Sequence, residues 1–213
     1  VSNSQMIDWI DHITKSHGKK VKFLNFKEAR ERLTKNLLGG QPLKNINGQD
    51  NGVRLLDLDN DGFMDVVIGN EHVQQTRLWN PKTQKWDISH FPFRIVQNDS
   101  KGNSEETGAK FGILQPNGYA SVFISNKSIK GIWHFNGNTW TQNNTNIRGL
   151  ELNKQMIQTS VNGQDNGIRL RDTNNDGIWE IIISNFKVQG VFSWNKTQNK
   201  WIKLRFNLPK NVS

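Results

Sequence analysis

Two short acidic segments share one spacing that suits the binding of a hard cation. The first, DLDNDGFMD, runs from Asp57 to Asp65, and the second, DTNNDGIWE, runs from Asp172 to Glu180. Calcium takes about six to eight oxygen ligands, and such a loop offers side chains at positions 1, 3, 5 and 9 and a carbonyl at position 7. The ligands predicted for two calcium ions are Asp57, Asp59, Asp61, the carbonyl of Phe63 and Asp65, and then Asp172, Asn174, Asp176, the carbonyl of Ile178 and Glu180.

The loops differ from a helix-flanked calcium loop. Gly62 and Gly177 stand at position 6, where such a loop turns sharply, but the Glu expected at position 12 of an EF-hand is replaced by Ile68 and Ile183. Both isoleucines belong to apolar runs typical of strands, so each loop is expected to join two strands. An alternative without metal is that Asp, Asn and Gly are the residues that turns prefer.

An internal repeat organises most of the chain. The segment NGQDNGVRLLD (residues 47–57) returns with two changes as NGQDNGIRLRD (residues 162–172). A weaker third copy, residues 107–126, lies between them, which gives a period of about 55–60 residues.

The middle repeat keeps the turn and loses the acids. Its positions that match the predicted ligands and the turn glycine hold Ile113, Gln115, Asn117, Gly118 and Ser121. A turn alone does not explain the joint loss of every carboxylate, whereas a discarded metal site does.

Each repeat contains four short predicted strands. In the first they are GVRLLDL, FMDVVIGN, QTRLWN and KWDISHF, separated by Gly, Asn, Asp and Pro. Four strands at this period are typical of a β-propeller blade. We therefore expect a mainly β fold with three blades, at about residues 45–100, 101–150 and 151–213. The tryptophans are expected to pack between blades; the alternative is a row of exposed sugar-stacking platforms.

The pattern D-x-D-x-D-G-x-x-D between two strands resembles the calcium loop of FG-GAP or VCBS repeats, and the resemblance covers about residues 45–213. Such repeats build integrin-like β-propellers and some fungal and bacterial lectins. The resemblance implies that calcium is structural, that the loops are not catalytic, and that a carbohydrate or protein ligand binds elsewhere. It also implies an extracellular or periplasmic location. The middle repeat departs from the pattern, so no metal ligand is assigned there.

Residues 1–40 differ from the repeats and are expected to form an α/β appendage. Apolar residues at positions 6, 7, 10 and 13 predict a helix, VKFLNF (residues 21–26) predicts a strand, and the segment that stops at Gly39 and Gly40 predicts a second helix. The sequence of this segment is similar to the C-terminal end of polysaccharide deacetylase-like domains, although their metal-binding His and Asp motifs are absent. Alternative functions are therefore a non-catalytic part of such an esterase and a protein–protein adhesion module.

Composition excludes several classes of function. The sequence has no cysteine, which excludes disulfides and thiol catalysis. It has no apolar run near the ~18 residues of a membrane span and no signal-peptide pattern. No close metal spacing of histidines and no phosphate-binding or nucleophile motif is present, so no catalytic residue is predicted.

The formal net charge of +9 favours an anionic ligand. Arg54, Lys110 and Arg169 occupy one position in all three repeats, early in the first strand, which is innermost in propellers. We expect them to ring the funnel and to bind an acidic polysaccharide; an ordinary exposed strand position is the alternative. Nucleic acid is not expected, because the tryptophans that could stack on bases are assigned to the core. Asp50 and Asp165 are interpreted as turn residues.

Three blades are fewer than the four to eight of closed propellers. We therefore expect an open stack whose two end faces, rich in Val, Ile and Trp, meet water. This predicts either a homo-oligomer or further blades in a longer parent protein.

Overall fold

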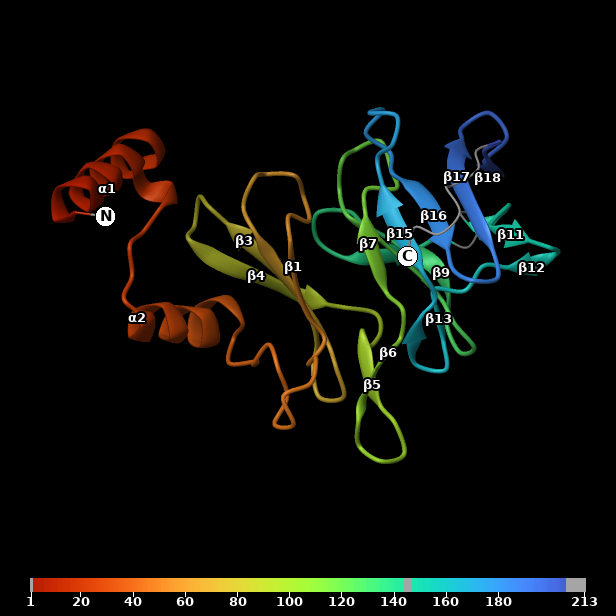
Figure 1. Ribbon diagram of the computed structural model, residues 1–213, viewed down its shortest axis with the longest axis horizontal. Helices are drawn as coiled ribbons and strands as arrows, with labels where there is room; N and C mark the ends of the chain where they lie inside the picture. Colours follow the sequence, from red (N-terminus) through yellow and green to blue (C-terminus); the bar gives the residue numbers. More distant parts are fainter. Residues whose placement is uncertain (1, 144–146, 206–213) are drawn as a thin grey trace. The chain divides into compact units, whose positions relative to one another are not determined.

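The computed structural model describes residues 2–143 and 147–205. The chain divides into two compact units, Val1–Gln41 and Pro42–Ser213, and each is treated by itself. Figure 1 shows helices in the first unit and strands in the second. In the part of the chain that the structure describes, no helix combines the length and the apolar character needed to cross a membrane.

The first unit is helical. Its elements are α1 (Asn3–His17), the 3-10 turn η1 (Gly18–Lys20), α2 (Phe26–Glu31) and the π-helical segment η2 (Arg32–Leu37). Ser2 and Gln5 form a capping box at the start of α1, and Asn25 and Glu28 form another at the start of α2, so both helices begin where side chains satisfy the first backbone amides. The two predicted helices are confirmed.

The strand predicted at residues 21–26 is wrong. Residues 21–25 form no strand, and Phe26 is already the first residue of α2. The described part of this unit contains no second strand with which the segment could pair. A β-type sequence needs such a partner to form a sheet.

Three four-stranded antiparallel sheets make up most of the second unit (Figure 1). The four strands of each sheet agree with the four predicted for each repeat, and they pair in chain order. The sheets are β1 (Val53–Leu56), β2 (Asp65–Gly69), β3 (Gln74–Asn80) and β4 (Lys85–His90); β7 (Lys110–Gly112), β8 (Ser121–Ser125), β9 (Lys130–Phe135) and β10 (Trp140–Gln142); and β15 (Ile168–Arg171), β16 (Glu180–Ser184), β17 (Gln189–Asn195) and β18 (Lys200–Lys203).

Small hairpins, which the sequence did not predict, accompany the large sheets. They are β5 (Val96–Asn98) with β6 (Ser104–Glu106), β11 (Glu151–Leu152) with β12 (Gln155–Met156), and β13 (Ser160–Val161) with β14 (Gln164–Asp165). A single bridge between Lys44 and Asp50 closes a similar turn before β1.

The middle sheet is covered on both faces. Val122 and Ile124 of β8 belong to an apolar cluster shared with the first sheet, whereas Phe123 belongs to a second cluster shared with the third sheet. Because neighbouring strand residues point to opposite faces, this alternation means that the sheet lies between the two clusters. All five residues of β8 are buried for this reason.

Several tryptophans of the repeats pack in or against the two apolar clusters. Trp133 and Trp201 are 8% and 2% exposed and belong to the first and second cluster, and Trp140 packs against the first. Trp79 and Trp86 pair across β3 and β4 with ring centroids 5.1 Å apart. The prediction that tryptophans pack between sheets is confirmed for Trp133, Trp140 and Trp201.

The third sheet does not expose the apolar face that was expected. Three positions that hold Leu56, Leu58 and Leu78 in the first repeat hold Arg171, Thr173 and Ser193 in the third. The leucines pack into the first cluster, facing the second sheet, so the same side of the third sheet is polar.

The first sheet meets the expectation of an open apolar face only in part. Val66 and Ile68 of β2 are both fully buried. Its exposed large apolar side chains are Leu55, Met64 and Ile88, at 42%, 61% and 58% exposure.

Candidate functional site

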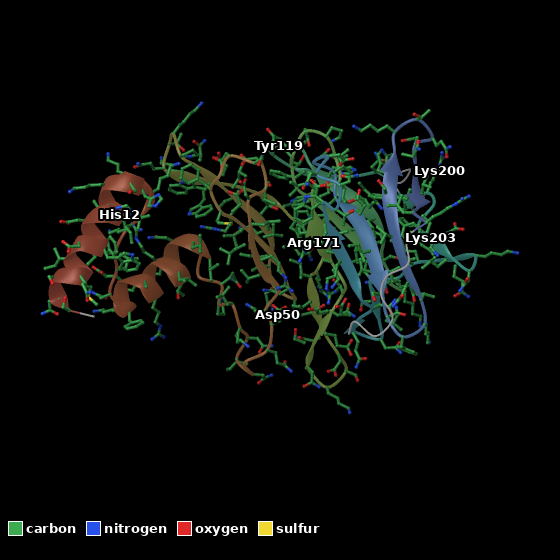
Figure 2. All side chains as sticks on the ribbon, turned by 45° about the horizontal axis from the view of Figure 1, so that its top comes forward. His12, Asp50, Tyr119, Arg171, Lys200 and Lys203 are labelled. Carbon is green, nitrogen blue, oxygen red and sulfur yellow. The ribbon has the colours of Figure 1, made fainter. Side chains whose placement is uncertain are left out.

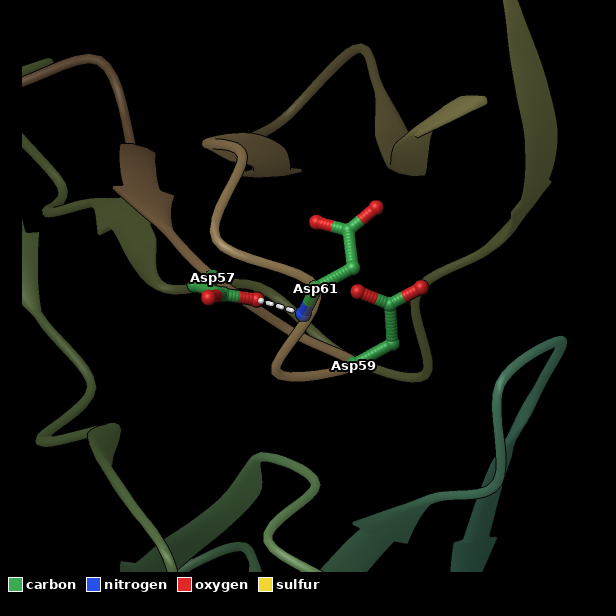
Figure 3. Close-up of side chains that lie close together, drawn as sticks. All are labelled: Asp57, Asp59 and Asp61. Carbon is green, nitrogen blue, oxygen red and sulfur yellow. Dashed lines mark hydrogen bonds between the residues drawn. The ribbon is translucent and has the colours of Figure 1, made fainter. Parts of the chain in front are cut away.

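The first acidic loop brings three carboxylates together (Figure 3). One oxygen from each of Asp57, Asp59 and Asp61 lies within 4.8 Å of the others, and no other group of three acidic or histidine side chains in the described ranges does so. The loop is shaped by its own hydrogen bonds. Asp57 accepts from the amides of Asp61 at 3.2 Å and Gly62 at 2.9 Å, and Asp61 accepts from the amide of Phe63 at 2.8 Å.

This arrangement is unfavourable without a positive charge. Asp59 Oδ1 is buried and has no hydrogen-bond partner. Burial and, after it, the charge of Asp61 raise the pKa of Asp59 above its ordinary value. A divalent cation among the three carboxylates removes their mutual repulsion and gives Asp59 the partner that it lacks.

Asp65, the predicted ligand at position 9, also connects three parts of the first sheet. Its side chain is 1% exposed; Oδ2 accepts from the amide of Leu58 at 2.9 Å, and Oδ1 accepts from the amide of Trp79 at 2.7 Å. Burial raises the pKa of Asp65 to about 6, although both hydrogen bonds act in the opposite direction. Each carboxylate oxygen has a further lone pair, so this role leaves capacity for a cation.

The second loop has the same turn but does not gather its acids. Asp172 accepts from the amides of Asp176 at 3.2 Å and Gly177 at 3.0 Å, as Asp57 does in the first loop. The side-chain amide of Asn174, however, donates to Asp176 and to Glu180, at 3.2 Å each. This amide occupies carboxylate oxygens that a cation would need.

Glu180 has the same structural role as Asp65. It accepts from the amide of Thr173 at 2.8 Å and from the hydroxyl of Ser193 at 3.2 Å. Its longer side chain thereby joins the loop to β17. Of the two predicted sites, the first has three carboxylates close together. In the second, the predicted ligand side chains are hydrogen-bonded to one another.

The loop of the middle repeat shows which acids the turn itself needs. Asn117 accepts from the amide of Tyr119 at 3.0 Å, the bond that Asp61 makes to Phe63. An amide oxygen therefore suffices at this position. The ring of His134 pairs with Ser121, which stands at position 9, at 2.8 Å. The matching positions of Asp57 and Asp59 hold Ile113 and Gln115, so the turn of the middle repeat forms without a carboxylate at either.

The three repeated cations are ion-paired with acids four residues before them. Arg54 lies 2.7 Å from Asp50, and Arg169 lies 2.6 Å from Asp165. Lys110 lies 3.8 Å from Glu106, and it also reaches Asp165 of the next repeat at 2.9 Å. Sequence reasoning missed these pairs, although the signal was present: an acid precedes the cation by four positions in every repeat.

The hairpins hold these acids in place. Glu106 is the last residue of β6, and Asp165 is the last residue of β14. The backbone carbonyls of Asp50 and Glu106 also link adjacent repeats. The hydroxyl of Ser104 donates to the carbonyl of Asp50 at 2.8 Å, and the hydroxyl of Ser160 donates to the carbonyl of Glu106 at 3.0 Å. Asp50 and Asp165 are therefore more than turn residues.

Asp165→Asn should lower the free energy of unfolding at pH 7, and the difference from wild type should disappear in acid. Burial acts to raise the pKa of Asp165, but the hydrogen bonds and charges of Lys110 and Arg169 outweigh it and hold the pKa below 3.8. A carboxyl whose pKa falls on folding stabilises the protein above its unfolded pKa, and this stability is lost as the pH falls through the folded pKa. Urea unfolding at several pH values measures the difference. Asp87→Asn, at an exposed site on β4, is the control, and a difference for Asp165→Asn that does not shrink as the pH falls below 3.8 contradicts the assignment.

The predicted ligand-binding cations share one groove. Arg54, Lys110 and Arg169 all line a groove of about 620 Å³ beside β7 and β15. The structure therefore brings together the three residues that sequence repetition singled out. It adds Arg171, the last residue of β15, which the sequence analysis did not assign.

No family model, curated protein or solved structure matches the chain. We therefore base its function on the geometry of the acidic loop and of the groove.

Proposed function

We propose that the chain is a calcium-stabilised, non-catalytic binding module built from propeller-type blades. The observation that carries the calcium proposal is the buried, unpartnered Oδ1 of Asp59 beside two converging carboxylates. Asp57, Asp59, Asp61, the carbonyl of Phe63 and Asp65 form the proposed ligand set.

The stacking of the three sheets supports the propeller-type part of the proposal. Each sheet has four antiparallel strands in chain order, and the middle one shares an apolar cluster with each neighbour. Blades of propellers are four-stranded sheets of this kind. A bound cation stiffens the loop between the first two strands of such a sheet.

A second ion is proposed for the second loop. Its ligands are Asp172, Asn174, Asp176, the carbonyl of Ile178 and Glu180. Because Asn174 now donates to two of these carboxylates, its side chain must turn its oxygen inward before a cation binds. We therefore expect weaker binding at the second site than at the first.

The ligand that we propose is an acidic polysaccharide. Seven of the 19 acids belong to the two loops, which leaves 12 against 28 Lys and Arg, so the surface is strongly basic once calcium neutralises the loops. Such a module fits an extracellular or periplasmic setting, where calcium sites of low affinity are used. A protein–protein adhesion role and a part of a deacetylase-like esterase are the alternative proposals.

Calorimetric titration of the full chain with calcium tests the proposal. We expect one tighter and one weaker site, with the tighter one abolished by Asp59→Ala. A stoichiometry of zero refutes the metal part of the proposal. If wild type shows a single site and Asp59→Ala leaves its affinity unchanged, the ion belongs to the second loop instead.

A further inference from the structure

Arg171 differs from the other cations of the groove in its partners. Its Nη1 donates to the carbonyl of Leu170 at 2.9 Å, and none of the ion pairs found in residues 2–143 and 147–205 includes it. Arg54, Lys110 and Arg169 each have a carboxylate partner. A guanidinium has five N–H donors, so Arg171 keeps most of its donors for a ligand.

The scaffold of the repeat does not require an arginine at this position. The matching residue is Leu56 in the first repeat, where it packs against the first apolar cluster. It is Gly112 in the second, where an added Cβ would lie 2.8 Å from Trp179 and 2.9 Å from Leu170. In the first and second repeats, therefore, this position lies against apolar side chains of the next repeat. Arg171 is therefore a feature of the third repeat alone.

Two guanidiniums lie on one face of β15. Arg169 and Arg171 alternate with the buried residues Ile168 and Leu170, so both project to the exposed side of the strand. Residues two apart on a strand are separated by about 6.6–6.8 Å. This spacing presents two positive groups in a row, as successive charges of a polymer require.

The lining of the groove is rich in charged side chains. Its charged side chains are four cations and two acids: Arg54, Lys110, Arg169, Arg171, Glu106 and Asp165. Its lining also includes Phe111, a partly buried apolar side chain. A sugar ring that carries a carboxylate or a sulfate suits this lining, because its anionic group can pair with a guanidinium.

We propose that Arg171, together with Arg169, binds the carboxylate or sulfate groups of an acidic polysaccharide chain lying in this groove. The proposal rests on the binding role put forward above but not on the calcium sites. Single-stranded nucleic acid fits less well, because it needs aromatic faces on which bases stack. Phe111 is the aromatic residue of the groove, and it packs against Phe91 and Trp140.

Titration of the full chain with oligogalacturonate tests the proposal, with dextran as a neutral glycan and a heparin fragment as a sulfated one. Wild type should bind the two acidic chains and not dextran. Arg171→Gln removes the charge and keeps a polar side chain, and it should weaken binding about tenfold, the effect of one charge-assisted hydrogen bond. Arg171→Lys should recover part of the loss, because it restores the charge without the planar fork.

Lys200→Gln is the matched control, because Lys200 is an exposed cation of β18 in the same sheet and outside the groove lining (Figure 2, with Arg171). It should bind like wild type. Equal weakening by Lys200→Gln and Arg171→Gln overturns the proposal in favour of diffuse charge. So does tighter binding of a single-stranded oligonucleotide than of either acidic glycan. A calcium-dependent rise in melting temperature, measured on each variant, separates the proposals. If it persists while no glycan binds, the calcium proposal stands and the polysaccharide ligand is refuted. If the acidic glycans bind wild type and Arg171→Gln equally well, the groove proposal alone fails.

Discussion

Calcium at a hundredfold excess over its dissociation constant should raise the free energy of unfolding by about 2.7 kcal/mol for one site. For a chain of this length that corresponds to an increase of about 5–10 °C in the melting temperature. The physical reason is that the folded loop gathers Asp57, Asp59 and Asp61 within 4.8 Å, whereas the unfolded chain does not hold them together. Thermal melts by circular dichroism in calcium and in chelator measure the effect.

Asp59→Asn separates the metal from the turn. In chelator it should be at least as stable as wild type, because it removes one of three crowded charges and the residue whose pKa burial raises. In calcium it should lose the stabilisation that comes from the first site. Asp87→Asn, which removes an exposed charge of β4, should respond to calcium as wild type does. A variant Asp59→Asn that keeps the full calcium response would show that the first loop binds no ion.

Asp65→Ala should destabilise the fold by about 3 kcal/mol or more, both in calcium and in chelator. The substitution leaves the amides of Leu58 and Trp79 without their acceptor, and each unpaired buried donor costs about 1–3 kcal/mol. Chemical unfolding with urea, in the presence and absence of calcium, gives the two free energies.

Asp61→Ala is the contrasting variant, because Asp61 is exposed and its one hydrogen bond shapes only the turn. It should lose the stabilisation that calcium gives through the first site, and in chelator it should change stability by much less than Asp65→Ala. If Asp65→Ala matches wild type in chelator, the two hydrogen bonds of Asp65 do not support the sheet. If Asp65→Ala, like Asp61→Ala, differs from wild type only in calcium, Asp65 acts solely as a ligand.

The strands of the repeats were predictable because their signals are local. Alternating apolar residues bounded by Gly, Asn and Asp mark each strand, and the near-identical segments 47–57 and 162–172 fix where each repeat starts. The strand predicted at residues 21–26 failed for the opposite reason: a strand exists only when another strand pairs with it, and residue type does not report the partner.

The candidate metal-coordinating residues could likewise be predicted from the sequence, since oxygen-bearing side chains at alternating positions are a property of the chain itself. The sequence thus determined which loops offer a set of oxygen ligands and which repeat lacks the carboxylates. It could not show that the side-chain amide of Asn174 donates to Asp176 and Glu180, because an amide donates or accepts according to the groups that surround it.

The remaining features were decided by contacts between segments far apart in the sequence. Asp65 reaches an amide 14 residues away, and Lys110 pairs with Asp165 of the next repeat. The groove that collects four cations exists only because β7 and β15 lie side by side. Burial and pairing set the charge state, partners and exposure of each side chain, and both depend on which residues the folded chain brings near it rather than on the residue itself.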